Sequence, residues 1–425
     1  MKTKRTTLVI MTAITMMAVM FHACKKNNGG PNELNIVSMT AGGADLNSAT
    51  SPTDVPVDAT IEITFNTDIK AETATSNNIT LIQDYDEANI PIQITVSGPT
   101  LTIQPEAALG AGILYQLNLT SGLLSTDDQP LAQTSRTFTT AGTFTPAGII
   151  ANWTFENSAE DVAGNYDPST DGVVDITYAA SRNETAGQAA VFNGNTSIIE
   201  IPMADPLVET SDFTISFWMK PNSDHVNENG DPAGHFVMGL GAFYGIQYEI
   251  FSTYEGSKFA IRYEIANDPD STTGEDMWFP AEATDNTNGG WQGWDYARSL
   301  TPTEMQGYLK DSWTQVTYTY DGTDKRGTLY FNGLIMKSFD FDLWPDGDPK
   351  QSVTGMTYAG SEPDVVNDLA FGFIHSREGT MWDNEPWGGY DFETANHFKG
   401  QLDDVKIYHK VLTETEIQLM YDSES

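Results

Sequence analysis

The chain has 425 residues, room for two or three domains, and its 39% hydrophobic and 11% aromatic content is typical of packed cores rather than of a disordered protein. It carries 21 Lys and Arg against 59 Asp and Glu, which gives a formal net charge of −38. A surface this acidic repels phosphate backbones, so the composition argues against a nucleic-acid partner.

Residues 1–23 have the pattern of a secretory signal peptide. A short basic start precedes an apolar run that ends at Phe21 and is too short to span a membrane. Cys24 follows directly and resembles the acylated cysteine of bacterial lipoproteins. It is the only cysteine, which excludes a disulfide within the chain. We therefore expect membrane attachment through a lipid on Cys24 alone, with residues 24–31 as a polar tether.

Residues 32–141 contain short runs in which hydrophobic residues alternate with polar ones, for example 61–65 and 115–119. This period of two predicts a small antiparallel sandwich. Tyr115, shortly after Gly110, has the spacing of a tyrosine corner. The segment resembles bacterial Ig-like domains that act as spacers on surface proteins. It shows no cluster of His, Cys or carboxylates, so we expect a spacer, followed by a linker over residues 142–148.

Residues 149–425 predict a second β domain. Phe213, Ile215 and Phe217 mark the buried face of one strand. Asn332-Gly333 between two apolar runs is a strong signal for a β-hairpin.

The end of the chain predicts a strand, a turn and a short helix. Val405 and Ile407 alternate with polar residues, and the same period places Asp403 on the inward side. Thr413 stands three residues before Glu416, the spacing of a capping box, so a helix should begin there. A buried Asp403 requires a cation or several hydrogen-bond donors.

These landmarks resemble those of laminin-G-like, concanavalin-A-like sandwich domains. Besides the closing stretch at 400–408, the resemblance rests on stretches in that family's order: 152–156, 161–165, 190–194, 213–221, 313–316 and 329–333. It implies an all-β chain, with the Ig-like β-sandwich followed by a concanavalin A-like (laminin-G-like) jelly-roll β-sandwich that carries long aromatic insertions and a short C-terminal helix.

The resemblance also implies a structural calcium ion at the rim of the sandwich, since oxygen ligands suit this ion. First and last strands of such domains usually neighbour each other, so Asp161 and Asp403 are the predicted ligands. The alternative is that each carboxylate caps a turn through backbone N–H groups.

Two long insertions, 266–310 and 376–396, are rich in aromatic rings beside Asp and Asn. Such rings can stack on the C–H face of a sugar while the polar groups bind its hydroxyls. The alternative is a satellite core under the loops. The predicted carbohydrate-binding residues are Trp278, Trp291, Trp294, Tyr296, Trp382 and Trp387.

No catalytic motif is complete in the sequence. Retaining glycoside hydrolysis needs two carboxylates about 5 Å apart. The nearest match, Glu362–Asn367, has Asn367 in place of the last carboxylate, and Pro363 favours a loop. We therefore expect no enzyme, with a hydrolase or lyase on the same fold and a protein-binding adhesin as alternatives.

Together these features predict a lipid-anchored outer-membrane protein, displayed on the cell surface, that binds a polysaccharide or oligosaccharide. It would be similar to accessory proteins of polysaccharide-utilisation systems, with components of a glycan-uptake complex as further partners.

Overall fold

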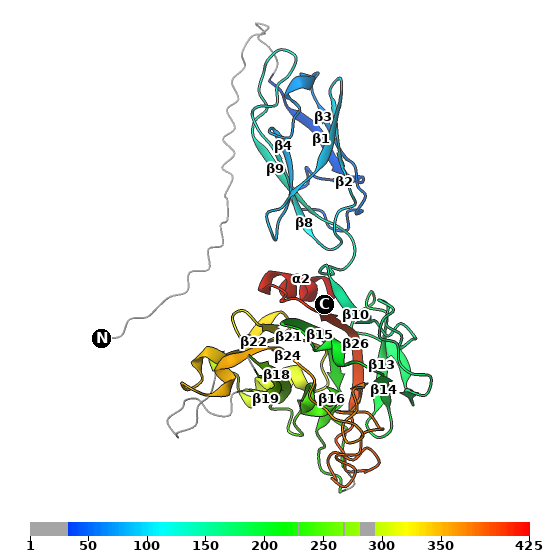
Figure 1. The fold of residues 1–425 in the computed structure, drawn as a ribbon. Coiled ribbons are helices and arrows are strands. Elements are labelled where there is room, and N and C mark those ends of the chain that lie inside the picture. Colours follow the sequence, from blue (N-terminus) through cyan, green and yellow to red (C-terminus); the bar gives the residue numbers. More distant parts are fainter. Residues whose placement is uncertain (1–32, 228, 267, 281–293) are drawn as a thin grey trace, which may run out of the picture.

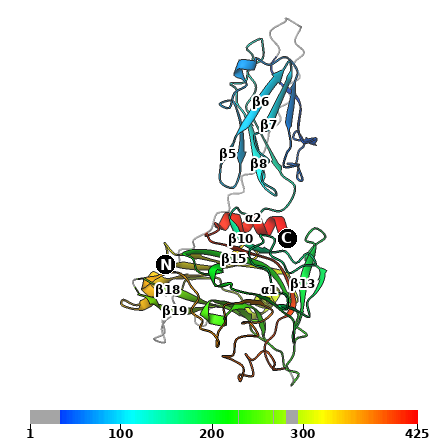
Figure 2. The same cartoon turned by 45° about the vertical axis from the view of Figure 1, so that its right-hand side comes forward.

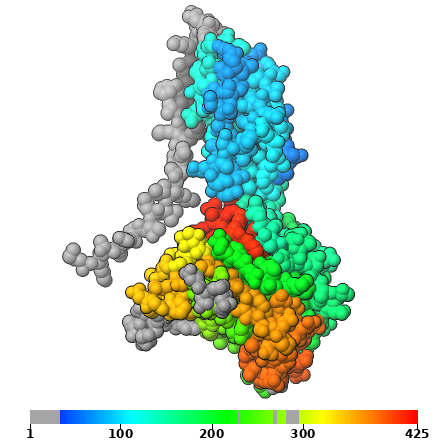
Figure 3. All heavy atoms as spheres, in the orientation of Figure 1, coloured from blue at the N-terminus to red at the C-terminus, as the bar shows by residue number. Residues whose placement is uncertain are grey.

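The computed structural model describes residues 33–227, 229–266, 268–280 and 294–425. The chain is nearly all β, as the sequence predicts, and forms two β-sandwich domains with the terminal helix α2 (Glu414–Glu424) between them (Figures 1 and 2). Figure 3 shows the same arrangement as two bodies that meet at this helix. No helix among the described residues is long and apolar enough to cross a membrane.

The N-terminal domain packs two antiparallel sheets face to face, in the orders β2-β1-β3-β7-β6 and β5-β4-β8-β9. Its strands are β1 (Ile36–Ala41), β2 (Ala44–Asp45), β3 (Ile61–Phe65), β4 (Ile79–Gln83), β5 (Asn89–Ile90), β6 (Ile92–Ser97), β7 (Thr100–Pro105), β8 (Leu114–Leu119) and β9 (Thr134–Thr139). The predicted tyrosine corner is confirmed, because the backbone N–H of Gly110 donates to the Tyr115 hydroxyl at 2.8 Å.

The chain enters this domain at the end opposite the junction with the second domain. Leu34 bridges to Leu131, near the Leu119–Thr134 end of the β8–β9 ladder. The other end of that ladder, Leu114–Thr139, lies at the crevice that α2 shares with this domain. The N-terminal domain therefore stands between the start of the described chain and the second domain.

The C-terminal domain is also a sandwich of two sheets. The sheet next to α2, here the helix-side sheet, has the order β12-β13-β26-β15-β21-β22-β23-β20, and β10 pairs with β26. The opposite sheet, here the outer sheet, has the order β11-β14-β25-β16-β17-β18-β19, and β24 pairs with β18.

The helix-side strands are β10 (Ile149–Trp153), β12 (Thr177–Ala180), β13 (Gln188–Asn193), β15 (Asp212–Pro221), β20 (Trp294–Ala297), β21 (Thr314–Asp321), β22 (Arg326–Phe331), β23 (Leu334–Asp340) and β26 (Lys399–Tyr408). The outer strands are β11 (Val173–Val174), β14 (Ile198–Ile201), β16 (His235–Leu240), β17 (Ile246–Ile250), β18 (Ser257–Ile265), β19 (Asp268–Phe279), β24 (Val353–Met356) and β25 (Leu369–Phe371). Helix α1 (Pro302–Leu309) lies between β20 and β21 in the chain.

The sandwich core follows the predicted alternation. Phe213, Ile215 and Phe217 are buried between the two sheets. The predicted hairpin is present at Asn332-Gly333, where both residues have positive φ values of 49° and 74°. This backbone conformation is the reason that Asn-Gly is favoured in two-residue hairpin loops.

Helix α2 begins where the capping box predicts. The Thr413 hydroxyl accepts from the Glu416 backbone N–H at 3.2 Å, and the Glu416 carboxylate accepts from the Thr413 N–H at 2.9 Å. Ile417 and Met420 are buried in an apolar cluster that continues into the N-terminal domain. The backbone N–H of Phe144 donates to Ser423 Oγ at 2.9 Å. The two domains therefore share apolar contacts through α2.

The inward placement of Asp403 was wrong. Strand β26 has an irregularity at Asp403 and Asp404, where Asp404 has a φ of 47°. Because of this extra residue, Leu402 and Val405 both face the sandwich core, and Asp403 pairs with Trp218 on the α2 side of the sheet. The side chain is still fully buried, but under helix α2.

The insertion 266–310 is largely regular structure rather than a long loop. It contributes β19, which adds the edge strand to the outer sheet, then β20 and helix α1. The early part of β19, Asp-Pro-Asp-Ser-Thr-Thr-Gly, has no alternation of hydrophobic residues, so the sequence gives little sign of a strand. Residues 281–293 lie outside the described part.

Candidate functional site

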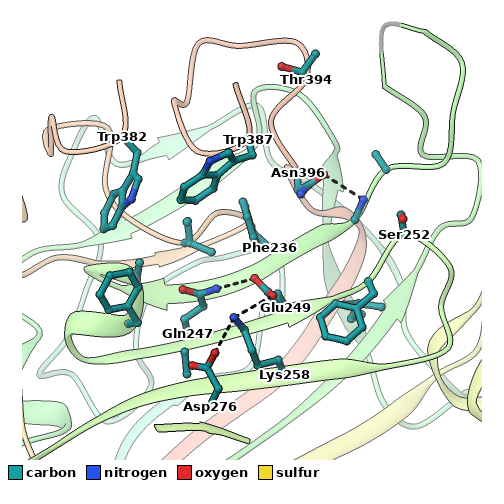
Figure 4. A pocket seen from close by; sticks show the side chains of 18 of the residues that line it. Phe236, Gln247, Glu249, Ser252, Lys258, Asp276, Trp382, Trp387, Thr394 and Asn396 are labelled. Atoms are coloured by element: carbon teal, nitrogen blue, oxygen red, sulfur yellow. Dashed lines mark hydrogen bonds and ion pairs between the residues drawn. The ribbon is translucent and has the colours of Figure 1, made fainter. Parts of the chain in front are cut away.

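A groove of about 670 Å³ lies on the outer sheet (Figure 4). The strands of this sheet lie on the side of the C-terminal domain away from α2 (Figure 1). Strands β16 to β19 form its floor, and the segment from Ile374 to Asn396 forms one wall. Its principal lining residues are Phe236, Phe243, Gln247, Glu249, Phe251, Lys258, Ala260, Asp276, Trp382, Trp387 and Asn396.

Strand alternation places the polar residues on this floor. Ile246 and Tyr248 of β17 point into the sandwich core, so Gln247 and Glu249 point outward. Lys258 stands directly opposite Glu249 in the antiparallel register. The floor is therefore a polar face built on buried apolar strands.

On the floor, the ammonium of Lys258 pairs with two carboxylates. The Lys258 ammonium lies 3.4 Å from a Glu249 oxygen and 3.2 Å from an Asp276 oxygen, and Gln247 donates to Glu249 at 2.7 Å. Burial raises the pKa of Glu249, and Lys258 opposes that rise. Burial also acts to lower the pKa of Lys258, but the two carboxylates raise it overall. The result is a fixed set of donors and acceptors with one surplus negative charge.

Aromatic rings form the wall above this floor. Figure 4 shows Trp382 and Trp387 above the strands that carry Gln247, Glu249 and Lys258. Trp382 is buried at 6% exposure, whereas Trp387 is 43% exposed. The two indoles lie 6.4 Å apart, and Trp387 also meets Phe236 edge to face at 6.4 Å. Trp387 therefore offers a free ring surface that Trp382 and Phe236 support.

The wall segment is held by hydrogen bonds at several points. The Phe236 N–H donates to the Asn396 carbonyl at 2.7 Å, and the Gly234 N–H donates to Asn396 Oδ1 at 3.1 Å. His375 Nε2 lies 2.8 Å from the Gly388 carbonyl. At its start, Arg377 forms an ion pair with Glu200. The groove is therefore preformed by backbone and side-chain contacts, which lowers the entropy cost of binding.

The predicted carbohydrate residues divide between this groove and other places. Trp382 and Trp387 line it. Trp278 is next to it, since its ring lies 4.8 Å from that of Phe251 and 5.0 Å from the Lys258 ammonium. Tyr296 is exposed on β20, in the other sheet, and does not line the groove. Trp294 also belongs to β20, but its side chain is not described. Trp291 lies outside the described residues.

Some of these rings also belong to a satellite core, the alternative stated above. Trp382 packs in an apolar cluster with Phe236, Phe373 and Ile374. This cluster holds the wall segment against the outer sheet. Of the two predicted rings that line the groove, Trp387 is the one whose exposure fits stacking on a ligand.

Sequence reasoning missed the floor residues Gln247, Glu249, Lys258 and Asp276. The alternation of β17 was the available signal, because it places two polar residues on the outer face of an otherwise buried strand. Their convergence depends on the register among three strands, which no local motif encodes.

The structure gives Asp161 and Asp403 protein partners. The Asp161 carboxylate accepts from the backbone N–H groups of Asn152, Ala163, Asn165 and Tyr166 at 2.7–3.1 Å. A carboxylate that accepts from several backbone N–H groups caps a turn. Asp161 therefore matches the alternative to calcium binding that the sequence left open. Asp403 accepts from Arg182 at 2.7 Å.

The cation beside Asp403 is thus a guanidinium. Among the described residues, no group of three or more His, Cys, Asp or Glu side chains is arranged to hold a metal ion. Calcium at Asp161 and Asp403 stays a prediction without a cation-binding geometry to support it.

The remaining sequence hypotheses concern catalysis and the anchor. Residues 362–367 form turns and bends, which confirms the loop interpretation of the Glu362–Asn367 motif. Cys24 and the signal peptide lie outside the described residues.

Comparison with known proteins supports the N-terminal assignment. Residues 45–140 match the family model of the bacterial Ig-like domain. No curated protein matches the sequence.

Solved structures similar to the chain include the receptor-binding domain of botulinum neurotoxin type G, with 14% identity, a TM-score of 0.36 and coverage of 65% of this chain and 51% of that chain. Another is domain 4 of an extracellular arabinanase from Geobacillus stearothermophilus in complex with arabinotriose. Its sequence identity is 18% and its TM-score is 0.34, and the match covers 64% of this chain and 98% of that chain. The chain spans about half the length of the toxin domain. At these scores the likenesses carry no functional argument.

Proposed function

We propose that the protein is a non-catalytic glycan-binding lipoprotein of the cell surface, and that the groove on the outer sheet is its binding site. The observation that carries this proposal is the exposed indole of Trp387 above a floor of fixed polar groups. An aromatic ring beside a few placed donors and acceptors is the arrangement that suits a sugar, which has apolar C–H faces and hydroxyl edges.

The C-terminal domain fits a laminin-G-like, concanavalin-A-like sandwich. Its first strand β10 and last strand β26 pair in one sheet, as the resemblance implies. This topology supports the family assignment of the domain, and the groove chemistry supports the binding role.

The order of the two domains along the molecule supports display of the groove at the cell surface. The described chain starts at the far end of the Ig-like domain. Strands β16 and β19, which contribute to the floor of the groove, lie on the side of the second domain away from α2 (Figure 1). A lipid on Cys24 would therefore leave the groove directed away from the membrane. This geometry favours a spacer role for the Ig-like domain within a polysaccharide-utilisation system.

A glycan array with the soluble protein, residues 32–425, tests the binding function. We expect binding of a defined class of oligosaccharide, and chromatography after long incubation should show the bound sugar intact. Lys258 pairs with both Glu249 and Asp276, an arrangement that supports binding of sugar hydroxyls. Release of new reducing ends would favour the hydrolase alternative, and an array without any binder would contradict the proposal.

Cys24→Ser is expected to release the protein from membranes, because no other cysteine can carry the lipid. Fractionation of cells that produce the full chain measures this. The matched control is Asn28→Ser in the tether, which keeps Cys24 and should leave the protein membrane-bound. A Cys24→Ser protein that stays with the membrane through high-salt washing would contradict lipid anchoring.

A further inference from the structure

Arg262 of β18 stands beside the groove. Its neighbours in the strand, Ile261 and Tyr263, point into the sandwich core, so the Arg262 side chain lies on the outer face with Ala260 and Lys258. Its cross-strand partner is Gly274, which has no side chain to cover the guanidinium.

Two aromatic rings hold the guanidinium in place. Its central carbon lies 5.3 Å from the centre of the Tyr244 ring and 5.9 Å from that of Phe243. Phe243 lines the groove and meets Trp382 edge to face at 6.0 Å. Cation–π contacts of this kind restrain the guanidinium beside Phe243, at the edge of the groove.

Among the side chains that the structure describes, no carboxylate is bound to this cation. Over the described residues, the Arg262 side chain has neither a hydrogen bond nor an ion pair, and its Nε is buried without an acceptor. Burial lowers the pKa of Arg262. The nearby acids have other partners, since Glu275 binds Lys350 and Asp276 binds Lys258.

This isolation is unusual in a chain with 59 acidic residues against 21 Lys and Arg. A partly buried cation without an acceptor costs free energy that an external anion would recover.

We propose that Arg262 is an anion-binding subsite that takes the carboxylate or sulfate group of an acidic sugar at the end of the groove. This inference rests on the proposed glycan-binding function and names its ligand class. A planar guanidinium can donate two parallel N–H groups to one oxyanion. Here the side-chain donors have no acceptor among the described residues, and Tyr244 and Phe243 contact the guanidinium from the protein side.

The charges of the groove also predict where the acidic sugar sits. The floor has two carboxylates, Glu249 and Asp276, against one ammonium, Lys258, which favours neutral sugars there. Arg262 supplies positive charge only at one end. Electrostatic effects of the −38 net charge beyond about 8 Å are largely screened at physiological ionic strength. The preferred ligand is therefore a mainly neutral oligosaccharide with one acidic residue.

Titration of three matched tetrasaccharides tests this subsite: one neutral, one with a terminal hexuronic acid and one with a terminal sulfate ester. Wild-type protein should bind one or both acidic forms at least tenfold more tightly than the neutral form. Arg262→Gln should remove that preference and leave neutral binding within twofold, with an unchanged melting temperature. Arg262→Lys, which keeps the charge but not the paired donors, should restore the preference only in part.

The outcomes separate this inference from the proposed function. Preference for the sulfated form identifies sulfate as the anion, and preference for the uronic acid identifies carboxylate. If the wild type binds the neutral form but gains nothing from either acidic group, or if Arg262→Gln keeps the gain, the subsite is refuted while the glycan groove stands. Absence of binding to every tetrasaccharide and to the array would refute both.

Discussion

Arg182→Met is expected to lower the free energy of unfolding of the protein by about 3–5 kcal/mol, the usual cost of leaving a buried charge without its partner. The Arg182 side chain is 5% exposed and lies 2.7 Å from Asp403 and 2.6 Å from Asp404. It also donates to the Glu424 carbonyl at 2.8 Å and stacks on Trp218 at 4.6 Å. Burial raises the pKa of Asp403, with Asp404 acting in the same direction and Arg182 opposing it.

Chemical denaturation of the soluble protein measures this cost. The matched control is Arg326→Met, because Arg326 pairs with Asp295 and Asp340 but is 39% exposed, and it should cost about 1 kcal/mol or less. Adding Asp403→Asn to Arg182→Met should recover part of the loss, since it removes the stranded charge. A cost for Arg182→Met no larger than that of the control would show that this network does not hold α2.

Ile417→Ala is expected to destabilise the protein by about 2–5 kcal/mol, because it opens a cavity in a packed core. Ile417 is fully buried on α2, in the apolar cluster shared by the helix and the Ig-like domain. The variant should therefore also loosen the junction between the domains, which small-angle scattering would detect as greater extension or bending.

The exposed Thr415 of the same helix provides the control. Thr415→Ala should change stability by no more than about 0.5 kcal/mol. If Ile417→Ala lowers stability without any change in scattering, α2 stabilises the C-terminal domain but does not set the junction.

Local features of this fold were predictable from the sequence because each depends on only a few residues that are close together in the chain. Asn332-Gly333 specifies its hairpin through backbone conformation, and Thr413 with Glu416 specifies the start of α2 through two hydrogen bonds. Tyr115 finds its partner five residues earlier, at Gly110. Each is a short-range signal with one dominant physical cause.

The site was only partly predictable because it depends on register and on long-range packing. Aromatic enrichment indicated Trp382 and Trp387, but it could not separate the supporting ring from the exposed one. Glu249, Lys258 and Asp276 meet only through the pairing of β17, β18 and β19. A single extra residue in β26 moved Asp403 to the other face of its sheet, which no period of two could anticipate.

Titration of the oligosaccharide selected by the array against Trp387→Ala and Phe392→Ala is the most direct measurement of whether the groove is the binding site. Both rings lie on the same wall segment with similar exposure, 43% and 38%, but Trp387 lines the groove and Phe392 does not. A stacked ring contributes on the order of 1 kcal/mol or more, so Trp387→Ala should weaken binding about tenfold. Phe392→Ala should bind like the wild type, and both variants should melt near the wild-type temperature. Equal affinities for the two variants would contradict a ligand site in this groove.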